Sequence, residues 1–345
     1  MRTRRIAFVS VLAACAAAIP AAPAMAGGDV TVMTRNIYLG ADIITLATAP
    51  DRAAFETAAS QIWKNVQATN FPKRAPALAK EIKAAKPDLV GLQEAAVWRT
   101  GSKGATANKV RYDFTKELLA ALKKQKMEYT VVVRQQEFDY QAPTTSEEVR
   151  LTMFDVILKR KKGSKVKTGK TSSGNYSAAN TLVVPTAVGD APSRRGWTAV
   201  DASIGGTDFK FVNTHLEAYG AGFRTGQANE LLAPGGPLAD ANQTAILLGD
   251  LNSGPTSAAP DGYPVLAGAG FTNVWGDRTD VRTFGRNELL TAQDSGGSFI
   301  DQIMYRPSAN FSVKSKTVIG NSAFQKKAPK WSSDHNGVVA KLSLK

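Results

Sequence analysis

The stretch Ala245-Ile246-Leu247-Leu248-Gly249-Asp250-Leu251-Asn252-Ser253 decides how the chain folds. Its apolar run is too short for a helix and predicts a buried strand. The strand delivers Asp250 and Asn252 at its C-terminal end, as side chains that face a metal ion or a phosphate. A Gly-Asp pair after a strand is more often an ordinary turn. The site interpretation therefore depends on whether other strands end in the same way.

Residues 1–26 have the pattern of a signal peptide. Three arginines precede an apolar run over residues 6–19, and Ala24-Met25-Ala26 has the small-x-small form of a signal peptidase site. We therefore expect a secreted protein whose mature chain begins near Gly27. The sequence before Cys15 also fits a bacterial lipoprotein cleavage box, so lipid anchoring at Cys15 is the alternative.

The mature chain suits a globular domain with a sizeable core. The sequence has 345 residues, of which 43% are hydrophobic, and shows no internal repeat or linker after the signal. We expect one domain over residues 27–345 and a monomer. Cys15 is the only cysteine, so the mature chain is stabilised without disulfides. No run after residue 26 approaches the length of a transmembrane segment.

The chain is basic, which favours a substrate that carries phosphate. Without the three arginines of the signal, 40 basic residues face 29 acidic ones, a balance of +11. Nucleic acid, phospholipid headgroups and phosphorylated small molecules all fit this charge. Residues 159–170 carry seven Lys or Arg and no acid. They predict a solvated hairpin or loop, and the alternative is a patch that tracks phosphates.

Predicted strands and helices alternate along the chain. Periodicity predicts strands over residues 29–35, 89–92, 129–133, 154–158, 208–213, 245–250, 298–305 and 337–344. Helical spacing predicts helices over residues 51–69, from about residue 75, and over residues 112–124 and 223–233. The indole of Trp63 is expected in the core, whereas Trp98 and Trp197 fit either the core or a substrate groove.

Polar side chains lie at the ends of these strands. The set is Asn36, Glu94, His215, Asp250, Asn252, Asp301, Asp334 and His335. It includes both histidines of the chain. Because sheet ends gather side chains into one cleft, we expect this set to meet.

The residue types in this set suit metal-assisted hydrolysis. They lack a Cys or Ser nucleophile motif and the clustered His and Cys of a zinc site. Carboxylate and amide oxygens, from Glu94 with Asp250, Asn36 or Asp334, instead suit Mg2+, Mn2+ or Ca2+. A divalent ion beside two imidazoles is equipped for phosphoester hydrolysis, in which a His or an Asp deprotonates the attacking water.

The order of these motifs resembles a known family. The series is Asn36; Leu92-Gln93-Glu94; Asn213-Thr214-His215-Leu216; Gly249-Asp250-Leu251-Asn252; Ile300-Asp301; and Ser333-Asp334-His335. It is similar to that of the endonuclease/exonuclease/phosphatase superfamily, the DNase I-like metal-dependent phosphodiesterases, and covers nearly the whole mature chain. The resemblance implies an α/β fold, a four-layer α/β/β/α sandwich of two packed mixed sheets flanked by helices, with a cleft at the strand ends.

The resemblance also implies roles on the metal side of the site. Glu94 matches the principal metal ligand, Asn36 a ligand on the metal or phosphate side, and Asp334 a second acid of the metal site. Asp250 and Asn252 match the pair that orients or activates water and holds the phosphate. Mg2+ is the expected cofactor, with Mn2+ or Ca2+ as alternatives.

The histidines take the remaining implied roles. His335 matches the general base or transition-state stabiliser, and Asp301 the carboxylate that aligns its ring. His215 matches a position that is His in DNase and sphingomyelinase members, which pair it with a Glu. Glu147 and Glu148 are the guesses for that partner. Arg195, together with Asn252, is the candidate for substrate binding.

Three functions follow from this interpretation. The leading one is a secreted metal-dependent phosphoester hydrolase, with nuclease activity as the first substrate hypothesis. A sphingomyelinase or a phosphoinositide-type hydrolase of lipid headgroups is the first alternative. A non-catalytic phosphate-binding module on the same fold is the second.

Overall fold

Two large mixed sheets form the centre of the computed structural model, which describes residues 27–345. The predicted signal peptide and Cys15 fall in residues 1–26, outside the described residues. Across residues 27–345, no helix is both long enough and apolar enough to span a bilayer.

The first sheet combines strands from both ends of the chain. Its members are β1 (Asp29–Asn36), β2 (Leu89–Gln93), β3 (Val97–Ser102), β4 (Lys109–Asp113), β5 (Tyr129–Pro143), β6 (Glu147–Arg160), β17 (Phe311–Ile319) and β18 (Gly337–Leu344). The order is β17-β18-β1-β2-β6-β3-β4, and β5 pairs with β6. Since β1 runs parallel to β2 and antiparallel to β18, the sheet is mixed.

The second sheet contains the strand that ends at Asp250. Its members are β7 (Lys167–Asn175), β10 (Gly196–Ile204), β11 (Thr207–His215), β12 (Ala245–Asp250), β13 (Thr272–Asn273) and β16 (Asp301–Arg306). They follow the order β13-β16-β12-β11-β10-β7. Two small two-stranded sheets pair β8 (Leu182–Val184) with β9 (Ala191–Ser193), and β14 (Phe284–Arg286) with β15 (Gln293–Ser298).

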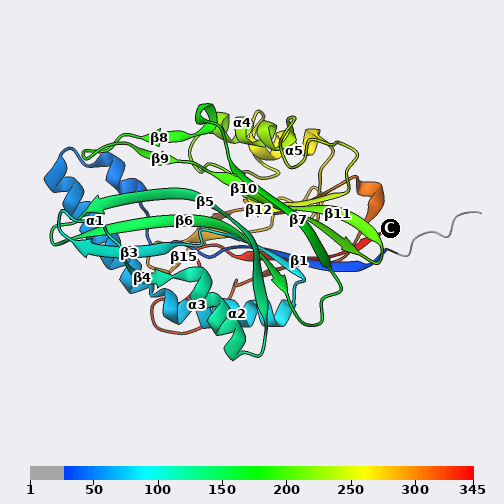
Figure 1. The fold of residues 1–345 in the computed structure, drawn as a ribbon, viewed down its shortest axis with the longest axis horizontal. Coiled ribbons are helices and arrows are strands. Elements are labelled where there is room, and N and C mark those ends of the chain that lie inside the picture. Colours follow the sequence, from blue (N-terminus) through cyan, green and yellow to red (C-terminus); the bar gives the residue numbers. More distant parts are fainter. Residues whose placement is uncertain (1–26) are drawn as a thin grey trace, which may run out of the picture.

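The helices connect and cover these strands. They are α1 (Arg52–Thr69), α2 (Phe71–Ala85), α3 (Phe114–Lys124), α4 (Ala221–Leu232) and α5 (Gly262–Gly268), with short 3-10 turns η1 (Ile44–Thr48), η2 (Ala178–Asn180) and η3 (Ser308–Asn310). The α1 helix begins where Asp51 caps it by accepting a hydrogen bond from the Ala54 N–H. Figure 1 shows α2 and α3 beside the first sheet and α4 and α5 on the far side of the second.

Each large sheet packs against the other sheet on one face and against helices on the opposite face, which gives four layers. In β12, Ile246 and Leu248 pack between the two sheets, whereas Leu247 packs against α4 and α5. In β1, Val32 packs between the sheets and Met33 packs under α1 and α2. Successive strand residues point to opposite faces, so the continuous apolar run of β12 packs on both of its faces. The α/β sandwich of two mixed sheets with flanking helices, expected from the resemblance, is confirmed.

Among the predicted strands, the structure differs most clearly at two places. The β5 and β6 strands are much longer than the predicted ranges 129–133 and 154–158, and form one long hairpin. The predicted strand 298–305 is broken, because β15 ends at Ser298 and β16 starts at Asp301. The break puts Asp301 at the first position of a strand.

Candidate active site

Strand pairing brings the central acid of the site together with its neighbours. In the second sheet, Asp250 lies opposite His215 of β11 and opposite Asp301 of β16. In the first sheet, Asn36 ends β1 opposite Gln93 of β2, directly before Glu94. The parallel pair β1-β2 of the first sheet and the parallel pair β11-β12 of the second end at the same place, where Asn36 bonds to Asp250. This explains why polar residues so distant in sequence meet.

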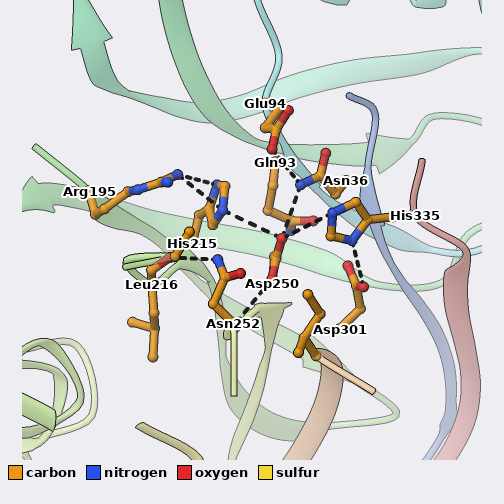
Figure 2. A network of polar contacts seen from close by, with 12 residues as sticks. Asn36, Gln93, Glu94, Arg195, His215, Leu216, Asp250, Asn252, Asp301 and His335 are labelled. Atoms are coloured by element: carbon orange, nitrogen blue, oxygen red, sulfur yellow. Dashed lines mark hydrogen bonds and ion pairs between the residues drawn. The ribbon is translucent and has the colours of Figure 1, made fainter. Parts of the chain in front are cut away.

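Asp250 is the centre of the polar network in Figure 2. Its Oδ2 accepts a hydrogen bond from Asn36 Nδ2 at 3.0 Å. The same oxygen lies 3.5 Å from His215 Nε2 and 3.6 Å from His335 Nε2. Burial is the main cause that raises the pKa of Asp250, to about 7, with the charge of Asp301 adding to it. This carboxyl can therefore exchange a proton near neutral pH.

The Gly-Asp-Leu-Asn sequence is both a turn and part of the site. Gly249 has φ +150° and passes so close to β11 that a Cβ there would lie 1.8 Å from the Thr214 carbonyl oxygen. Asn252 has φ 46°, its N–H donates to Asp250 Oδ1 at 3.0 Å, and its Nδ2 donates to the Leu216 carbonyl at 3.0 Å. The tight turn fixes both side chains relative to the strand end.

Glu94 is held in a strained backbone conformation. Its φ is 57°, which is uncommon for a residue other than Gly or Asn. The carboxylate accepts from Asn36 Nδ2 at 2.9 Å and from the Leu39 N–H at 2.7 Å. Asn36 Oδ1 accepts from the Tyr38 N–H at 2.9 Å. In this arrangement Asn36 orients the carboxylates of Glu94 and Asp250, and its own oxygen is bound to the backbone.

Asp334 is a second acid, close enough to Glu94 for their charges to interact. Burial raises the pKa of Asp334 to about 6, and the negative charge of Glu94 adds to this effect. Ser333 Oγ donates to its carboxylate at 3.2 Å. Two neighbouring carboxylates supply the hard oxygen donors that Mg2+, Mn2+ and Ca2+ prefer, and a cation would relieve their mutual repulsion.

His335 is surrounded by acids. Its Nδ1 lies 2.8 Å from Asp301 Oδ2, and its Nε2 faces Asp250. Burial lowers the pKa of His335, but Asp301, Asp250 and Asp334 together outweigh it and raise the pKa to about 10. The ring is thus an imidazolium at neutral pH.

His215 lies beside two buried carboxyls that sequence reasoning missed. Donor atoms of Glu137, Asp155 and His215 lie within 4.8 Å of one another. Burial raises the pKa of both Glu137 and Asp155. The charge of Asp155 raises the pKa of Glu137 further, and the charges of Asp250 and Glu94 raise that of Asp155. Burial lowers the pKa of His215 well below its ordinary value, and Arg195 and His335 reinforce this.

Glu147 and Glu148 are therefore the wrong partners for His215. They lie at the other end of β6, about 25 Å along the strand from Asp155 at its usual rise. Glu147 accepts from the Trp63 indole, and Glu148 accepts from the Gly104 N–H. Glu137 reaches His215 because it is the extra residue of a β-bulge in β5. The sequence signal that could have indicated these buried partners is Asp155, an acid inside an otherwise apolar strand.

Arg195 lies next to His215. Its Nη1 is 2.9 Å from His215 Nδ1, and its Nε is 3.4 Å from Glu217 Oε2. Ser193 Oγ donates to the same oxygen of Glu217 at 2.7 Å. Arg195 thus places a positive charge at the edge of the site, where a substrate phosphate would need it.

Buried arginines hold the loop that carries Asp334 and His335. Arg35 donates to the carbonyl oxygens of Asn36 and His335, at 3.1 and 2.7 Å. Arg74 donates to the carbonyl of Ser332 at 2.9 Å, and Arg286 to that of His335 at 2.9 Å. Sequence reasoning missed these arginines because buried Arg has no periodic signature.

The basic segment 159–170 lies away from the site. It connects β6 to β7, and Lys167 pairs with Ser203. The opposite end of β10, at Gly196, pairs with His215. The basic segment is therefore at the end of the second sheet remote from His215, and Arg160 in it pairs with Asp88 at 2.6 Å. This position favours the prediction of a solvated loop for residues 159–170 over the alternative of a patch that binds the phosphates of a substrate.

Several solved structures share the fold at low sequence identity. An endonuclease/exonuclease/phosphatase family protein from Bacteroides thetaiotaomicron matches with TM-score 0.55 and 16% identity, covering 92% of this chain and 99% of the other. The mannosyl-6-phosphatase of the same species matches with TM-score 0.55 and 18% identity, covering 91% and 99%. D. rerio TDP2 complexed with single-strand DNA product matches with TM-score 0.52 and 16% identity, covering 91% and 98%.

The sequence itself identifies the family. No curated protein matches the chain at a significant level. The model of the endonuclease/exonuclease/phosphatase family matches residues 62–335, most of the described chain. The ends of that match lie in α1 and at His335, so it includes Glu94, His215, Asp250 and Asp301. The chain therefore belongs to the endonuclease/exonuclease/phosphatase family.

Proposed function

We propose that the protein is a secreted, divalent-metal-dependent hydrolase of phosphoesters. The observation that carries this proposal is the position of Asp250, between two histidines of opposite protonation and beside the Glu94 and Asp334 carboxylates. The pattern of residues 1–26 supports export. Pairing of β1 with β18 joins the two ends of the described chain, which supports one domain over residues 27–345. All of these site residues come from one chain, so the proposed chemistry needs no second subunit.

Glu94 and Asp334 would hold the divalent cation. When bound, the cation neutralises charge on a phosphate oxygen and lowers the pKa of nearby water. Asn36 contributes by fixing the orientation of the Glu94 carboxylate.

The chain's own residues account for the proton transfers. Asp250 accepts the proton that the attacking water gives up, since its pKa of about 7 suits a base near neutral pH. The water oxygen forms a bond to phosphorus while the bond from phosphorus to the leaving oxygen breaks. The leaving oxygen keeps that electron pair and takes a proton from solvent.

His335 and Asn252 would stabilise the charge that develops on the phosphate. The pKa of His335 favours the stabiliser over the general base, because an imidazolium has no lone pair to accept a proton. Its Nδ1 is engaged by Asp301, which leaves the Nε2 proton for a phosphate oxygen. Asn252 presents its side chain from the turn after Asp250.

Hydrolysis of bis-p-nitrophenyl phosphate tests the proposal. We expect turnover with Mg2+ or Mn2+, abolition by EDTA and recovery when the metal is restored. Asp250→Asn should lose at least about a hundredfold in kcat/KM. Asp208→Asn, an exposed acid on the neighbouring strand β11, is the matched control. No turnover between pH 5 and 9 would contradict the proposal and favour a non-catalytic phosphate-binding module.

A substrate panel then separates the alternatives. It should contain single-strand DNA, a sugar phosphate and lipid headgroup esters such as sphingomyelin, because members of one fold act on different phosphoesters.

A further inference from the structure

We infer that the substrate is an amphiphilic phosphoester whose aliphatic chain binds in an apolar cavity beside the site. The inference rests on the proposed phosphoester hydrolysis and adds the chemical class of the substrate.

The cavity lies between four elements. Its interior leaves about 130 Å³ for the centres of water-sized molecules. The face of the β5-β6 hairpin, the α1 helix, the η1 turn and the separate β8-β9 sheet contribute its walls. Figure 1 shows β8 and β9 running alongside β5 toward α1.

The apolar wall starts at the site itself. Along β6, Asp155 is followed on the same face by Met153, Leu151 and Val149, because alternate residues share a face. The last three line the cavity. At the usual strand rise, this row extends about 20 Å from Asp155. On β5, Phe138, Tyr140 and Ala142 pair with the same three residues and widen the wall.

One end of the cavity is polar and is shared with the site. Glu94, Ser193, Arg195 and Glu217 line this end. Arg195 also contacts His215. A phosphate held near Glu94 and Arg195 would therefore direct one of its ester substituents into the cavity.

The lining favours a hydrocarbon chain over a nucleobase or a sugar. The polar groups deeper in the cavity already have protein partners. The Trp98 indole donates to the Leu39 carbonyl at 2.8 Å, and Tyr140 Oη lies 2.9 Å from Thr186 Oγ1. A base or sugar would enter without hydrogen-bond partners, which costs free energy, whereas burial of methylene groups is favourable.

The β8-β9 sheet is built as an apolar cover. Leu182 and Val184 of β8 line the cavity, while Val183 between them points outward and is 48% exposed. The sheet pairs with neither large sheet. Its inner face therefore contributes to the cavity rather than to the main core.

A series of p-nitrophenyl alkyl phosphates with methyl, butyl and octyl chains tests the inference, at concentrations below micelle formation. We expect kcat/KM to rise about fourfold for each added methylene, the effect of burying one CH2 group expressed as a rate ratio. Equal rates for all chain lengths would overturn the inference and leave the proposed hydrolysis intact.

Two matched pairs of variants locate the effect. Ala47→Phe on η1 should fill the cavity and abolish the dependence on chain length, with turnover of the methyl ester unchanged. Thr48→Phe, exposed one residue later, should keep the dependence. Leu182→Ser should weaken the octyl preference, and Val183→Ser should not. A chain-length effect that survives both inward-facing substitutions would overturn this location.

Binding of alkylphosphonates separates failure of the inference from failure of the proposed function. Octylphosphonate should bind at least about a hundredfold more tightly than methylphosphonate in calorimetry, and Ala47→Phe should remove the difference. Equal binding of the two would overturn the inference even if no ester were turned over. Faster turnover of a single-strand DNA oligonucleotide than of the octyl ester would also contradict it.

Discussion

The two histidines of the protein lie in clusters of similar composition, but their rings differ in protonation. Each cluster contains one histidine and two buried carboxyls. In the His335 cluster, the acids raise the pKa of the ring to about 10. In the His215 cluster, burial and Arg195 lower the pKa of the ring well below its ordinary value. Residue types alone therefore do not fix the protonation of a site.

The pKa values of the two rings differ because their neighbouring groups differ in protonation and charge. Glu137 and Asp155 cannot both ionise in their buried position, and Arg195 already lies against His215. Asp301 contacts His335 directly at 2.8 Å, with two further acids nearby. One ring is thus fitted to donate a hydrogen bond to an anion, and the other to stay neutral beside it.

The largest expected contrast is in proton affinity. An NMR titration of the metal-free protein should show His335 protonated up to about pH 10 and His215 neutral between pH 6 and 8, a difference of about a thousandfold or more. The chain has only these two histidines, so one His215→Gln variant assigns both. If both rings titrated near pH 6.5, the two histidines would not differ in protonation, and the contrast between the clusters would be wrong.

Loss of the cationic ring should have the larger effect on catalysis. We expect His335→Ala to lower kcat/KM on bis-p-nitrophenyl phosphate by about a thousandfold, because it removes a charged donor to the transition state. The melting temperature of the variant, measured in parallel, checks that it is folded. Near-normal turnover would remove His335 from the mechanism.

Loss of the neutral ring should cost less. His215→Ala is expected to lower kcat/KM by about ten- to a hundredfold, since an uncharged ring contributes positioning and a weaker hydrogen bond. The informative quantity is the ratio of the two effects in the same assay. Equal losses would mean that both histidines carry charge in the transition state.

The smallest effect should be on stability, through Glu137. Its pKa is raised above the unfolded value of 4.5, so its contribution to stability is complete below about pH 4.5 and is lost as pH rises toward the folded-state pKa. Glu137→Gln should reduce the fall in unfolding free energy between pH 5 and 9 by about 1 kcal/mol or more. Urea unfolding measures it, with Glu128→Gln as an exposed control. An unchanged pH dependence would show that Glu137 is ionised in the folded protein.

The sequence predicted the site where a local pattern places a polar residue at a strand end. Asp250 follows four buried apolar residues, and Glu94 follows another such run. Asn36 and His215 end strands in the same way. The cover on both faces of β12 could also be anticipated, since its apolar run has no polar alternation.

What the sequence could not predict depends on contacts between distant elements. Glu137 reaches His215 only because a bulge adds a residue to β5, and a bulge has no clear sequence signal. The charge state of each histidine is set by neighbours from several strands. The apolar cavity depends on β8-β9, a short pair that the predicted strands did not include.

The buried arginines change what the basic composition means. Arg35, Arg74, Arg286 and Arg306 are at most 5% exposed, and each donates to main-chain carbonyl oxygens. Their guanidinium groups hold loops together and are not free to displace counterions from a polyanion. Because the salt dependence of nucleic-acid binding follows the number of phosphate contacts, it should be shallower than the isoelectric point suggests. The high isoelectric point of this chain therefore comes in part from arginines that bind carbonyl oxygens inside the fold, and only the remaining basic residues can attract a polyanion.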